Sequence, residues 1–546
     1  MRLAWAWVLA LGFSGAVYAC VGDQPVGPSD SGGPDGTVSD GSATDSPAVF
    51  DGGGDAPPGS PTHPPTSLAF TDQNPVKDNA AGTVTIGKAV DESDVTSYKL
   101  YWGLSTDGGS PIKLTQVADV PKTGSAVTYN LSAAVPQGAA YLMAVSSNAQ
   151  GEMTSGPFVT PIDNYPVHTD LSGDAGVNMG TMPSAAIDST NHKLIVATTD
   201  LSGEVVLFRC NLDGTACAMS NLGALTDAGS AGTGMNPSVV IDTAYNHILV
   251  ALRSGTNHLV AYRCDLNGQN CTMTDITTQT GGPTLGSTTV SAAMDSTNNS
   301  LDVAVMTGSY GRTGLYRCDL QSFNVCTLTD LTTLGLSDDG AGNNTGYVPS
   351  AAFANAKLYV SVVNEASSAF KPGLFVASST TSCTYSDVSA GQGNNSGGSG
   401  PWDGPSVVVD TTNGKVVVAS HDQSTAGNGK LTMFRCDLTG ASCTHTDISA
   451  GQPTDCGWYP HAAIDVAGAK LYVATWDVAN SGKPGLFQCA LDGTNCSYVD
   501  MSAGQGANSG DWISLVLDST NKRVLVVTEN DATGNSNLSL FSIGMW

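Results

Sequence analysis

The chain has 546 residues, a formal net charge of −27 at pH 7 and 64 glycines, and only 13% of its residues are charged. This length is too great for one ordinary domain, and a 40% share of hydrophobic residues excludes a chain that is disordered throughout. The negative charge would repel nucleic-acid phosphates and anionic lipid surfaces, so neither is expected as a binding partner.

Residues 1–19 have the pattern of a signal peptide, with Arg2, an apolar run over 3–13 and a small residue, Ala19, before Cys20. The apolar run is too short to span a bilayer as a permanent helix. Residues 17–20, Val-Tyr-Ala-Cys, resemble the bacterial lipobox, in which the cysteine is lipidated. The resemblance implies an exported lipoprotein of the outer membrane or cell surface, held to the membrane only through Cys20. Ordinary cleavage after Ala19 is the alternative.

Residues 20–65 consist mostly of Gly, Ser, Asp and Pro. They contain almost no large apolar side chains, so they cannot bury a core. We therefore expect a disordered tether between the lipid anchor and the folded part of the chain.

Residues 66–160 contain short alternating segments between Gly, Pro and Asp turns, which predict a β-sandwich. Residues 96–102, Thr-Ser-Tyr-Lys-Leu-Tyr-Trp, and 141–151 resemble the third strand and the F strand of a fibronectin type III domain. Ile86 stands where that family has an early core Trp. The resemblance implies a spacer or adhesive module, and no catalytic constellation is visible in this region.

Residues 161–546 repeat one pattern of four strands at intervals of roughly 55 residues. The first strand is rich in Ser and Ala, which suits a crowded central axis, and the second is a nearly continuous apolar run such as 193–197. Seven first strands are visible, which predicts an all-β, seven-bladed β-propeller. They begin at Pro183, Pro237, Val290, Pro349, Pro405, His461 and Ser514.

The seventh unit ends after its third strand. Residues 167–172, Val-His-Thr-Asp-Leu-Ser, match the outer strand at 444–449, Thr-His-Thr-Asp-Ile-Ser. We therefore expect this N-terminal strand to complete the seventh blade, because pairing the two ends closes the ring and removes free edges. An open β-solenoid, the alternative fold, needs no displaced strand.

Ten of the 13 cysteines form pairs that flank the turn between third and outer strands. Zinc hairpins usually place two to four residues between ligands and need a second pair nearby. The gaps here are longer, so we expect cross-strand disulfides and an oxidising compartment. The expected pairs are Cys210–Cys217, Cys264–Cys271, Cys318–Cys326, Cys436–Cys443 and Cys489–Cys496.

The turn at 489–496 resembles the Asp-box of sialidase-like propellers. Its length and Gly493 match, whereas Asp492 sits one place late and Cys replaces both Ser and Trp. The second-strand unit at 410–419 also resembles bacterial surface propeller repeats. These resemblances imply a fold and not an activity. In the fourth blade Ala377 occupies the first cysteine position, which leaves Cys383 without a partner, and Cys456 is also unpaired by pattern.

The outlet of each second strand carries a residue that differs in every blade, which indicates solvent or a ligand. These residues are Thr199, Arg253, Met306, Val363, His421, Trp476 and Glu529. Tryptophans and acidic residues also gather in the upper-face loops of blades four to seven, a composition typical of carbohydrate sites. The candidate ligand-binding residues are Tyr347, Trp402, Asp403, His421, Asp422, Trp458, His461, Trp476, Asp477, Asp511, Trp512 and Glu529, accompanied by Tyr459. Alternatively, the tryptophans plug the channel mouth or pack between blades.

Three functional hypotheses follow. The first is a surface platform that binds an extracellular glycan or protein. The second is an exported glycan hydrolase or lyase, with two carboxylates drawn from the candidates above, although no spacing selects a pair. The third is a purely structural scaffold for partner proteins. A sialidase is disfavoured, because the repeated arginines, Arg209, Arg263, Arg317 and Arg435, share one strand position and look structural.

We expect no cofactor and no catalytic metal. Asp- and Asn-rich loops could hold a structural calcium ion, although no run has full ligand spacing. The folded part is expected to be a compact monomer.

Overall fold

The computed structural model describes residues 59–70, 72, 79–104, 111–136, 139–159, 165–173, 179–223, 234–308, 311–321, 323, 325–335, 346–365, 370–379, 381–389, 391–393, 395–398, 403–423, 429–532 and 536–545. The predicted signal peptide, Cys20 and most of the predicted tether lie outside these residues. The described chain is built almost entirely of β-strands, so the prediction of an all-β protein is confirmed.

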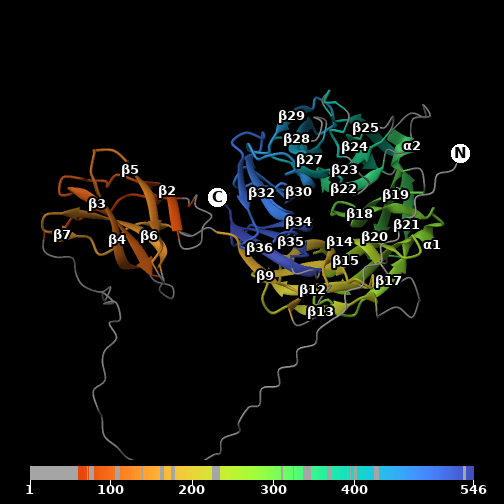
Figure 1. Cartoon of the computed structure of the whole chain (residues 1–546), viewed down its shortest axis with the longest axis horizontal. Coiled ribbons are helices and arrows are strands. Elements are labelled where there is room, and N and C mark those ends of the chain that lie inside the picture. Colours follow the sequence, from red (N-terminus) through yellow and green to blue (C-terminus); the bar gives the residue numbers. More distant parts are fainter. Residues whose placement is uncertain are drawn as a thin grey trace, which may run out of the picture. The chain divides into compact units, whose positions relative to one another are not determined.

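The first folded part is a sandwich of two antiparallel sheets (Figure 1). One sheet has the order β1-β2-β5, with β1 (Leu68–Ala69), β2 (Asn79–Ile86) and β5 (Val127–Ala134). The other has the order β4-β3-β6-β7, with β8 also paired to β6. Its strands are β4 (Ile112–Pro121), β3 (Ser97–Leu104), β6 (Ala139–Asn148), β7 (Gly151–Glu152) and β8 (Phe158–Val159). Ile86 is fully buried in the shared core.

The last residues of the predicted tether are bound to this sandwich. Pro65 forms a β-bridge with Ala89, and the Ser146 hydroxyl donates a hydrogen bond of 2.7 Å to the carbonyl of His63. The side-chain amide of Asn148 donates one of 2.9 Å to the carbonyl of Gly59. Order therefore begins before residue 66.

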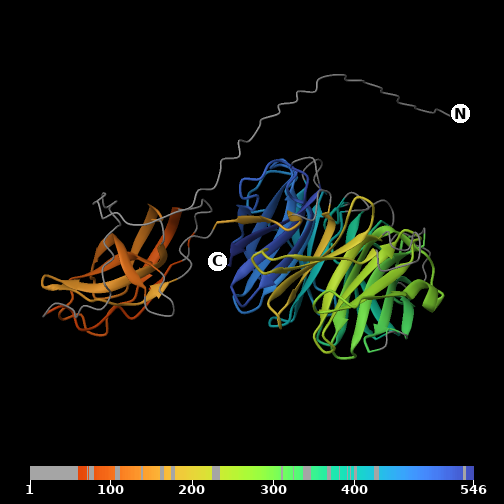
Figure 2. The ribbon, with the colours of Figure 1, turned by 90° about the horizontal axis from the view of Figure 1, so that it is seen from below.

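The second folded part is a β-propeller (Figures 1 and 2). Its described residues form seven four-stranded antiparallel sheets, which we call propeller sheets one to seven in chain order. Sheets one to three contain β10 (Thr181–Asp188), β11 (Lys193–Thr199), β12 (Val205–Asn211), β13 (Ala218–Asn221); β14 (Gly234–Asp242), β15 (His247–Ser254), β16 (Leu259–Asp265), β17 (Thr272–Asp275); β18 (Leu285–Asp295), β19 (Ser300–Thr307), β20 (Arg312–Asp319) and β21 (Cys326–Asp330).

In the remaining sheets the strands again follow chain order, except that the last strand of sheet seven is β9 (Val167–Asp170). Sheets four to seven contain β22 (Tyr347–Ala354), β23 (Lys357–Asn364), β24 (Lys371–Ser379), β25 (Ser382–Asp387); β26 (Ser406–Asp410), β27 (Lys415–Asp422), β28 (Lys430–Asp437), β29 (Thr444–Asp447); β30 (Trp458–Asp465), β31 (Lys470–Asp477), β32 (Lys483–Ala490), β33 (Ser497–Asp500); β34 (Asp511–Asp518), β35 (Arg523–Asn530) and β36 (Asn537–Gly544). Two short helices, α1 (Ile276–Thr280) and α2 (Leu331–Gly335), follow β17 and β21.

The displaced N-terminal strand closes the propeller as expected. β9 pairs antiparallel with β36, with Val167 opposite Ser542 and Asp170 opposite Ser539. The backbone N–H of Leu171 continues the pairing with a hydrogen bond of 2.8 Å to the carbonyl of Leu538. The edge of sheet seven is therefore covered by a strand from the other end of the propeller sequence.

A ring of side-chain hydrogen bonds joins the innermost strands. In each sheet one side chain, a serine or once a histidine, accepts the backbone N–H of the next innermost strand at 2.9–3.2 Å. We call this set the serine ring; its acceptors are Oγ of Ser184, Ser238, Ser291, Ser350, Ser406 and Ser514 and Nδ1 of His461. The ring includes the contact from sheet seven back to sheet one, so it holds the propeller closed around its axis.

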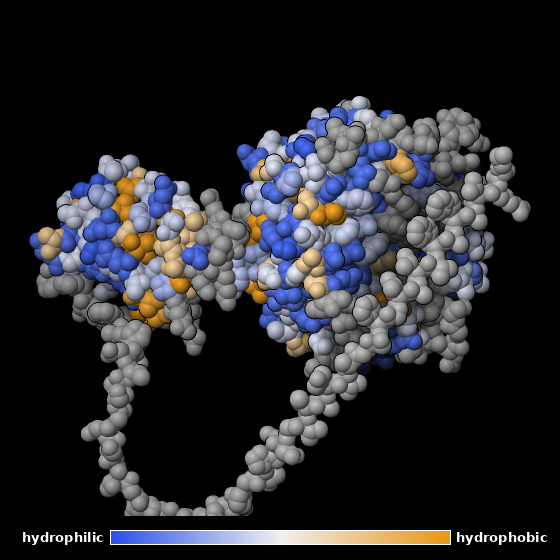
Figure 3. All heavy atoms as spheres, in the orientation of Figure 1, coloured by the Kyte–Doolittle hydropathy of each residue, from blue (hydrophilic) through white to orange (hydrophobic). Residues whose placement is uncertain are grey.

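Apolar side chains fill the space between neighbouring sheets. The second strands are buried on both faces, which explains their continuous apolar sequence. Each third strand adds one aromatic ring that is at most 1% exposed: Phe208, Tyr262, Tyr316, Phe375, Phe434, Phe487 and Phe541. On the face in Figure 3 the exposed hydrophobic residues of the propeller are scattered among hydrophilic ones.

All five expected disulfides are present, at the turn between third and outer strands. The repeated arginines beside them also have structural contacts. Arg209 and Arg263 donate hydrogen bonds to the carbonyls of Leu266 and Gln321 in the next sheet, at 2.9 and 3.3 Å. Arg317 instead binds the buried Asp302 in its own sheet, at 2.6 Å. These contacts agree with the interpretation that this arginine position serves the fold.

The fourth sheet lacks a disulfide because Ala377 faces Cys383 across the strand pair. We predict that Ala377→Cys forms a sixth disulfide and stabilises the propeller by about 2–3 kcal/mol, the value for such a short loop in the chain-entropy model. Peptide mass mapping without reduction, together with urea unfolding, measures both effects. Ser379→Cys, which lies beyond the register irregularity on the same strand, serves as the control. A variant that keeps a free Cys383 thiol would contradict the prediction.

Candidate functional site

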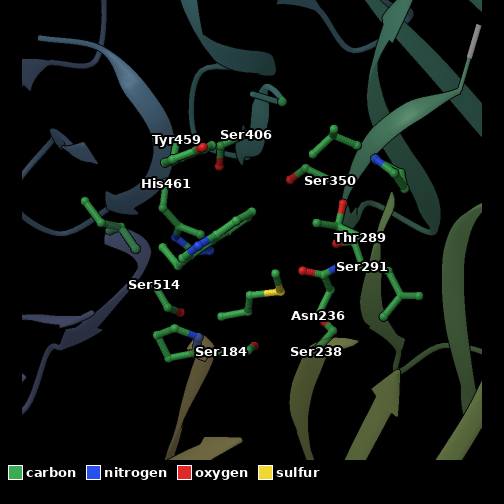
Figure 4. Close-up of a pocket in the computed structure, with 18 of the residues that line it drawn as sticks. Ser184, Asn236, Ser238, Thr289, Ser291, Ser350, Ser406, Tyr459, His461 and Ser514 are labelled. Atoms are coloured by element: carbon green, nitrogen blue, oxygen red, sulfur yellow. The ribbon is translucent and has the colours of Figure 1, made fainter. Parts of the chain in front are cut away.

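A cavity of about 180 Å³ lies on the propeller axis (Figure 4). Each sheet supplies three consecutive residues in or next to its innermost strand to the lining, from Met182–Ser184 in sheet one to Trp512–Ser514 in sheet seven. The third residue of each triplet belongs to the serine ring, and no described residue beyond this ring lines the cavity. The described part of the lining contains no Lys, Arg, Asp or Glu. The cavity is therefore a small, uncharged depression that is surrounded by all seven sheets.

The first residue of each triplet varies from sheet to sheet. In chain order these residues are Met182, Asn236, Thr289, Val348, Gly404, Tyr459 and Trp512. Five of them have a positive φ of 45–52°, namely Met182, Asn236, Val348, Tyr459 and Trp512. A β-bulge in the innermost strand lies at this point and re-aims the side chain. Because such a φ is unfavourable for bulky residues, the surrounding structure must hold it.

Three neighbouring sheets carry predicted site residues one position before these triplets. Trp458 lies opposite Trp476 in sheet six, and Asp511 lies opposite Glu529 in sheet seven. In sheet five the equivalent Asp403 is hydrogen-bonded to His421. The sequence prediction thus located side chains that the fold brings together in pairs.

Aromatic rings form a stack that borders the cavity. Tyr459 stacks on Trp512 with ring centroids 4.9 Å apart and on Trp476 with centroids 5.7 Å apart, at interplanar angles of 14° and 17°. Trp458 meets Trp476 edge-on at 6.2 Å. The indole N–H groups of Trp458 and Trp476 are buried and have no hydrogen-bond partner among the described residues. All four rings remain partly exposed. We call these residues the aromatic cluster.

Asp403 and His421 contact two members of the aromatic cluster. Both side chains are almost fully buried, and Nδ1 of His421 hydrogen-bonds to Oδ2 of Asp403. The other carboxylate oxygen of Asp403 accepts the backbone N–H of Tyr459 at 3.4 Å. The His421 ring lies 4.5 Å from the ring of Trp458. The pair therefore fixes both the strained backbone of Tyr459 and the position of Trp458.

Asp511 and Glu529 hold backbone groups of cavity residues in the same way. The Trp512 N–H donates to Asp511 at 2.9 Å, and the Met182 N–H donates to Glu529. Burial, together with the negative charge of Asp531, raises the pKa of Asp511 to about 6. Burial and the charges of Asp531 and Asp511 raise the pKa of Glu529 to about 7. Oε2 of Glu529 has no hydrogen-bond partner among the described residues.

The other predicted site residues have separate environments. His461 lies in the serine ring, where burial lowers its pKa to about 4 and Nδ1 accepts the N–H of Leu515. Asp477 accepts hydrogen bonds from the Tyr498 hydroxyl and the Asn480 N–H, which fixes the local loop. Tyr347 lies opposite Val363 in sheet four. A carboxylate oxygen of Asp422 lies 3.6 Å from Nε2 of His445. Trp402 lies outside the described residues.

Sequence reasoning missed Asn236 and Thr289, which line the cavity on the side opposite Tyr459 and His461 (Figure 4). A signal was present: the residue before each repeated Pro-Ser or its equivalent varies as strongly as the residue at the second-strand outlet.

Among the described residues no cluster of three or more His, Cys, Asp or Glu side chains could hold a metal ion. That part of the chain also contains no helix with the length and apolar character needed to cross a membrane.

No protein-family model and no curated protein matches the chain. Similar solved structures include the polysaccharide lyase Uly1, with 12% identity and a TM-score of 0.43 over 68% of this chain and 91% of that one. A quinoprotein alcohol dehydrogenase-like protein from Bacteroides thetaiotaomicron has 11% identity and a TM-score of 0.40, over 81% and 97% of the two chains. The six-bladed fucose-recognising lectin of Aleuria aurantia has 12% identity and a TM-score of 0.36, over 60% and 98%. Similarities this low say nothing about the activity of this chain.

The raised pKa values of Asp511 and Glu529 predict a pH-dependent stability. Both carboxyls bind protons more tightly in the folded chain than in the unfolded chain, where their pKa values are about 4. The stability they contribute is present below about pH 4 and is lost as the pH rises through about 6 and 7. Glu529→Gln should therefore gain up to about 3 kcal/mol relative to the wild type between pH 5 and 8.

Urea unfolding of the wild type and this variant at several pH values measures the difference. A difference that stays constant with pH would show that the Glu529 carboxyl titrates as an ordinary exposed group.

Proposed function

We propose that this chain is an exported, lipid-anchored surface protein whose seven-bladed propeller binds a carbohydrate with the aromatic cluster at the axial cavity. The parallel stack of Trp476, Tyr459 and Trp512 carries the proposal. Sugar rings present apolar faces that pack on such rings and hydroxyl groups that need hydrogen-bonding partners. Here the indole N–H groups of Trp458 and Trp476, which have no hydrogen-bond partner within the described part of the chain, are donors beside the stack.

The anchoring part of the proposal depends on the Val-Tyr-Ala-Cys motif at 17–20. Five disulfides favour an extracellular or exported location, because such bonds persist in oxidising compartments. The tether and the fibronectin type III-like sandwich then act as spacers between the membrane and the propeller. A net charge of −27 keeps the chain away from anionic lipid headgroups.

A glycan hydrolase on the same scaffold is the second candidate. The observation that favours it is the cross-strand pair of Asp511 and Glu529 beside the aromatic cluster. A hydrolase needs one protonated and one ionised carboxyl group. Both side chains of this pair accept backbone N–H groups of cavity residues, and neither is among the described residues that line the cavity. We therefore favour binding over hydrolysis.

Glycan-array binding of the mature full-length protein, followed by titration calorimetry with the best polysaccharide, tests the proposal. We expect Trp476→Ala and Trp512→Gly each to weaken binding about tenfold or more, since the loss of a stacking ring costs at least about 1.4 kcal/mol. Glycine suits the positive φ of Trp512, so that variant should remain folded. Tyr245→Ala, an exposed aromatic in the turn at the far end of β14, is the matched control.

Equal binding by the wild type and both tryptophan variants would remove the aromatic cluster from the site. Release of new reducing ends from the polysaccharide, lost in Glu529→Gln, would instead establish the hydrolase. If no glycan binds, a protein ligand replaces the carbohydrate as the first hypothesis.

A further inference from the structure

One side of the axial cavity carries polar groups that the fold leaves unused. The side chain of Asn236 is 4% exposed, and neither its amide nitrogen nor its amide oxygen has a hydrogen-bond partner among the described residues. The hydroxyl of Thr289 in the next sheet is also buried and without a partner there. A buried amide without hydrogen bonds has lost its hydration without compensation and so destabilises the fold. Such groups are rare in native proteins, and they need an explanation at each site.

The backbone conformation of Asn236 directs its side-chain amide into the cavity. The residue lies in a β-bulge with φ 52°, a conformation that Asn tolerates better than most residues. Pro237 follows it, and Ser238 of the serine ring then anchors the strand to sheet three. Figure 4 shows Asn236 and Thr289 directed into the cavity from neighbouring strands. The amide donor and acceptor and the hydroxyl thus form one polar wall.

The opposite side of the cavity is aromatic. Tyr459 and Trp512 line it, with His461 beside them. A ligand between the two sides would meet flat rings on one face and an amide and a hydroxyl on the other. A pyranose ring has this asymmetry, because one face exposes C–H groups and its edges carry hydroxyl groups.

The size of the cavity limits what can enter. Its volume is about 180 Å³. This space suits one monosaccharide, and it is smaller than the pockets of 300 Å³ or more that enclose larger ligands. Among the described residues the lining ends at the serine ring, whose side chains are committed to the next strand. We therefore expect a glycan chain to enter the cavity with its end.

Among the described residues, the lining of the cavity offers no charge that could pair with an acidic sugar. The lining has no Lys or Arg to pair with a carboxylate, and His461 is neutral at physiological pH. The carboxyl groups of Asp403, Asp511 and Glu529 accept hydrogen bonds from the backbone N–H groups of lining residues. An anionic ligand would lose hydration without gaining a counter-charge.

From these observations we infer that the axial cavity binds a single uncharged sugar unit at the end of a glycan chain, with Asn236 and Thr289 hydrogen-bonding its hydroxyl groups. This inference rests on the proposed carbohydrate binding and adds which part and which class of glycan the propeller recognises.

Titration calorimetry of the mature full-length protein with single sugars tests the inference. The probes are glucose, galactose, mannose, fucose and N-acetylglucosamine as uncharged sugars and glucuronic acid as the acidic one. We expect at least one uncharged sugar to bind and glucuronic acid to bind at least tenfold more weakly than its uncharged counterpart, glucose. Asn236→Asp, which keeps the shape but replaces the amide donor with a charge, and Thr289→Val should each weaken binding about tenfold or more.

The matched control is Asn246→Asp. Asn246 also has a positive φ, of 58°, but it lies exposed in the turn at the other end of β14, so this variant should bind like the wild type. Thermal unfolding of all variants separates loss of binding from loss of fold.

Three results would overturn the inference while leaving the proposed function intact: unchanged binding by Asn236→Asp and Thr289→Val, glucuronic acid bound as tightly as glucose, or binding of polysaccharide chains without binding of any single sugar. In each case the tryptophan variants would still lose the polysaccharide. If the wild type binds neither polysaccharides nor single sugars, the proposed function itself fails.

Discussion

The serine ring is the interaction on which the rest of the propeller depends. Each of its seven acceptors contacts the backbone of the next innermost strand, so no sheet reaches its position independently of its neighbours. Serine supplies a short acceptor that packs easily at the crowded axis, which explains why it recurs. His461 can replace serine in one sheet because its neutral ring also offers an acceptor, Nδ1. The ring thereby fixes the height at which the six bulges of the described innermost strands face the axis.

The bulges connect this ring to the candidate site. Positive φ values at Met182, Tyr459 and Trp512 are unfavourable in isolation, and carboxyl groups of Glu529, Asp403 and Asp511 respectively hold the backbone N–H of these residues. The acidic residues near the aromatic cluster thus serve mainly to shape the cavity wall. This arrangement explains why carboxylates gather beside the cavity although none of them lines it.

Much of the fold followed from the sequence because strand periodicity and repeats are local patterns. The match between 167–172 and 444–449 predicted the pairing of β9 with β36, and the cysteine spacing predicted all five disulfides. The site was predicted only in part. Asn236 was missed because a bulge, and not the strand period, aims it at the axis. The pairing of Asp403 with His421 depends on the register between two strands, which their separate sequences do not show.

The pairing of β9 with β36 has a consequence for synthesis and folding. His168 and Ser539 are hydrogen-bonded across 371 positions of the chain, one of the longest separations that this protein offers. A growing chain therefore presents two open strand edges until its last strand is made, because β9 has no partner before that point. A chain shortened at its C-terminus would keep both edges exposed, and β9 of one copy could then pair with the incomplete sheet of another. Such linear association of molecules is the characteristic failure expected of a ring that is closed by its two ends.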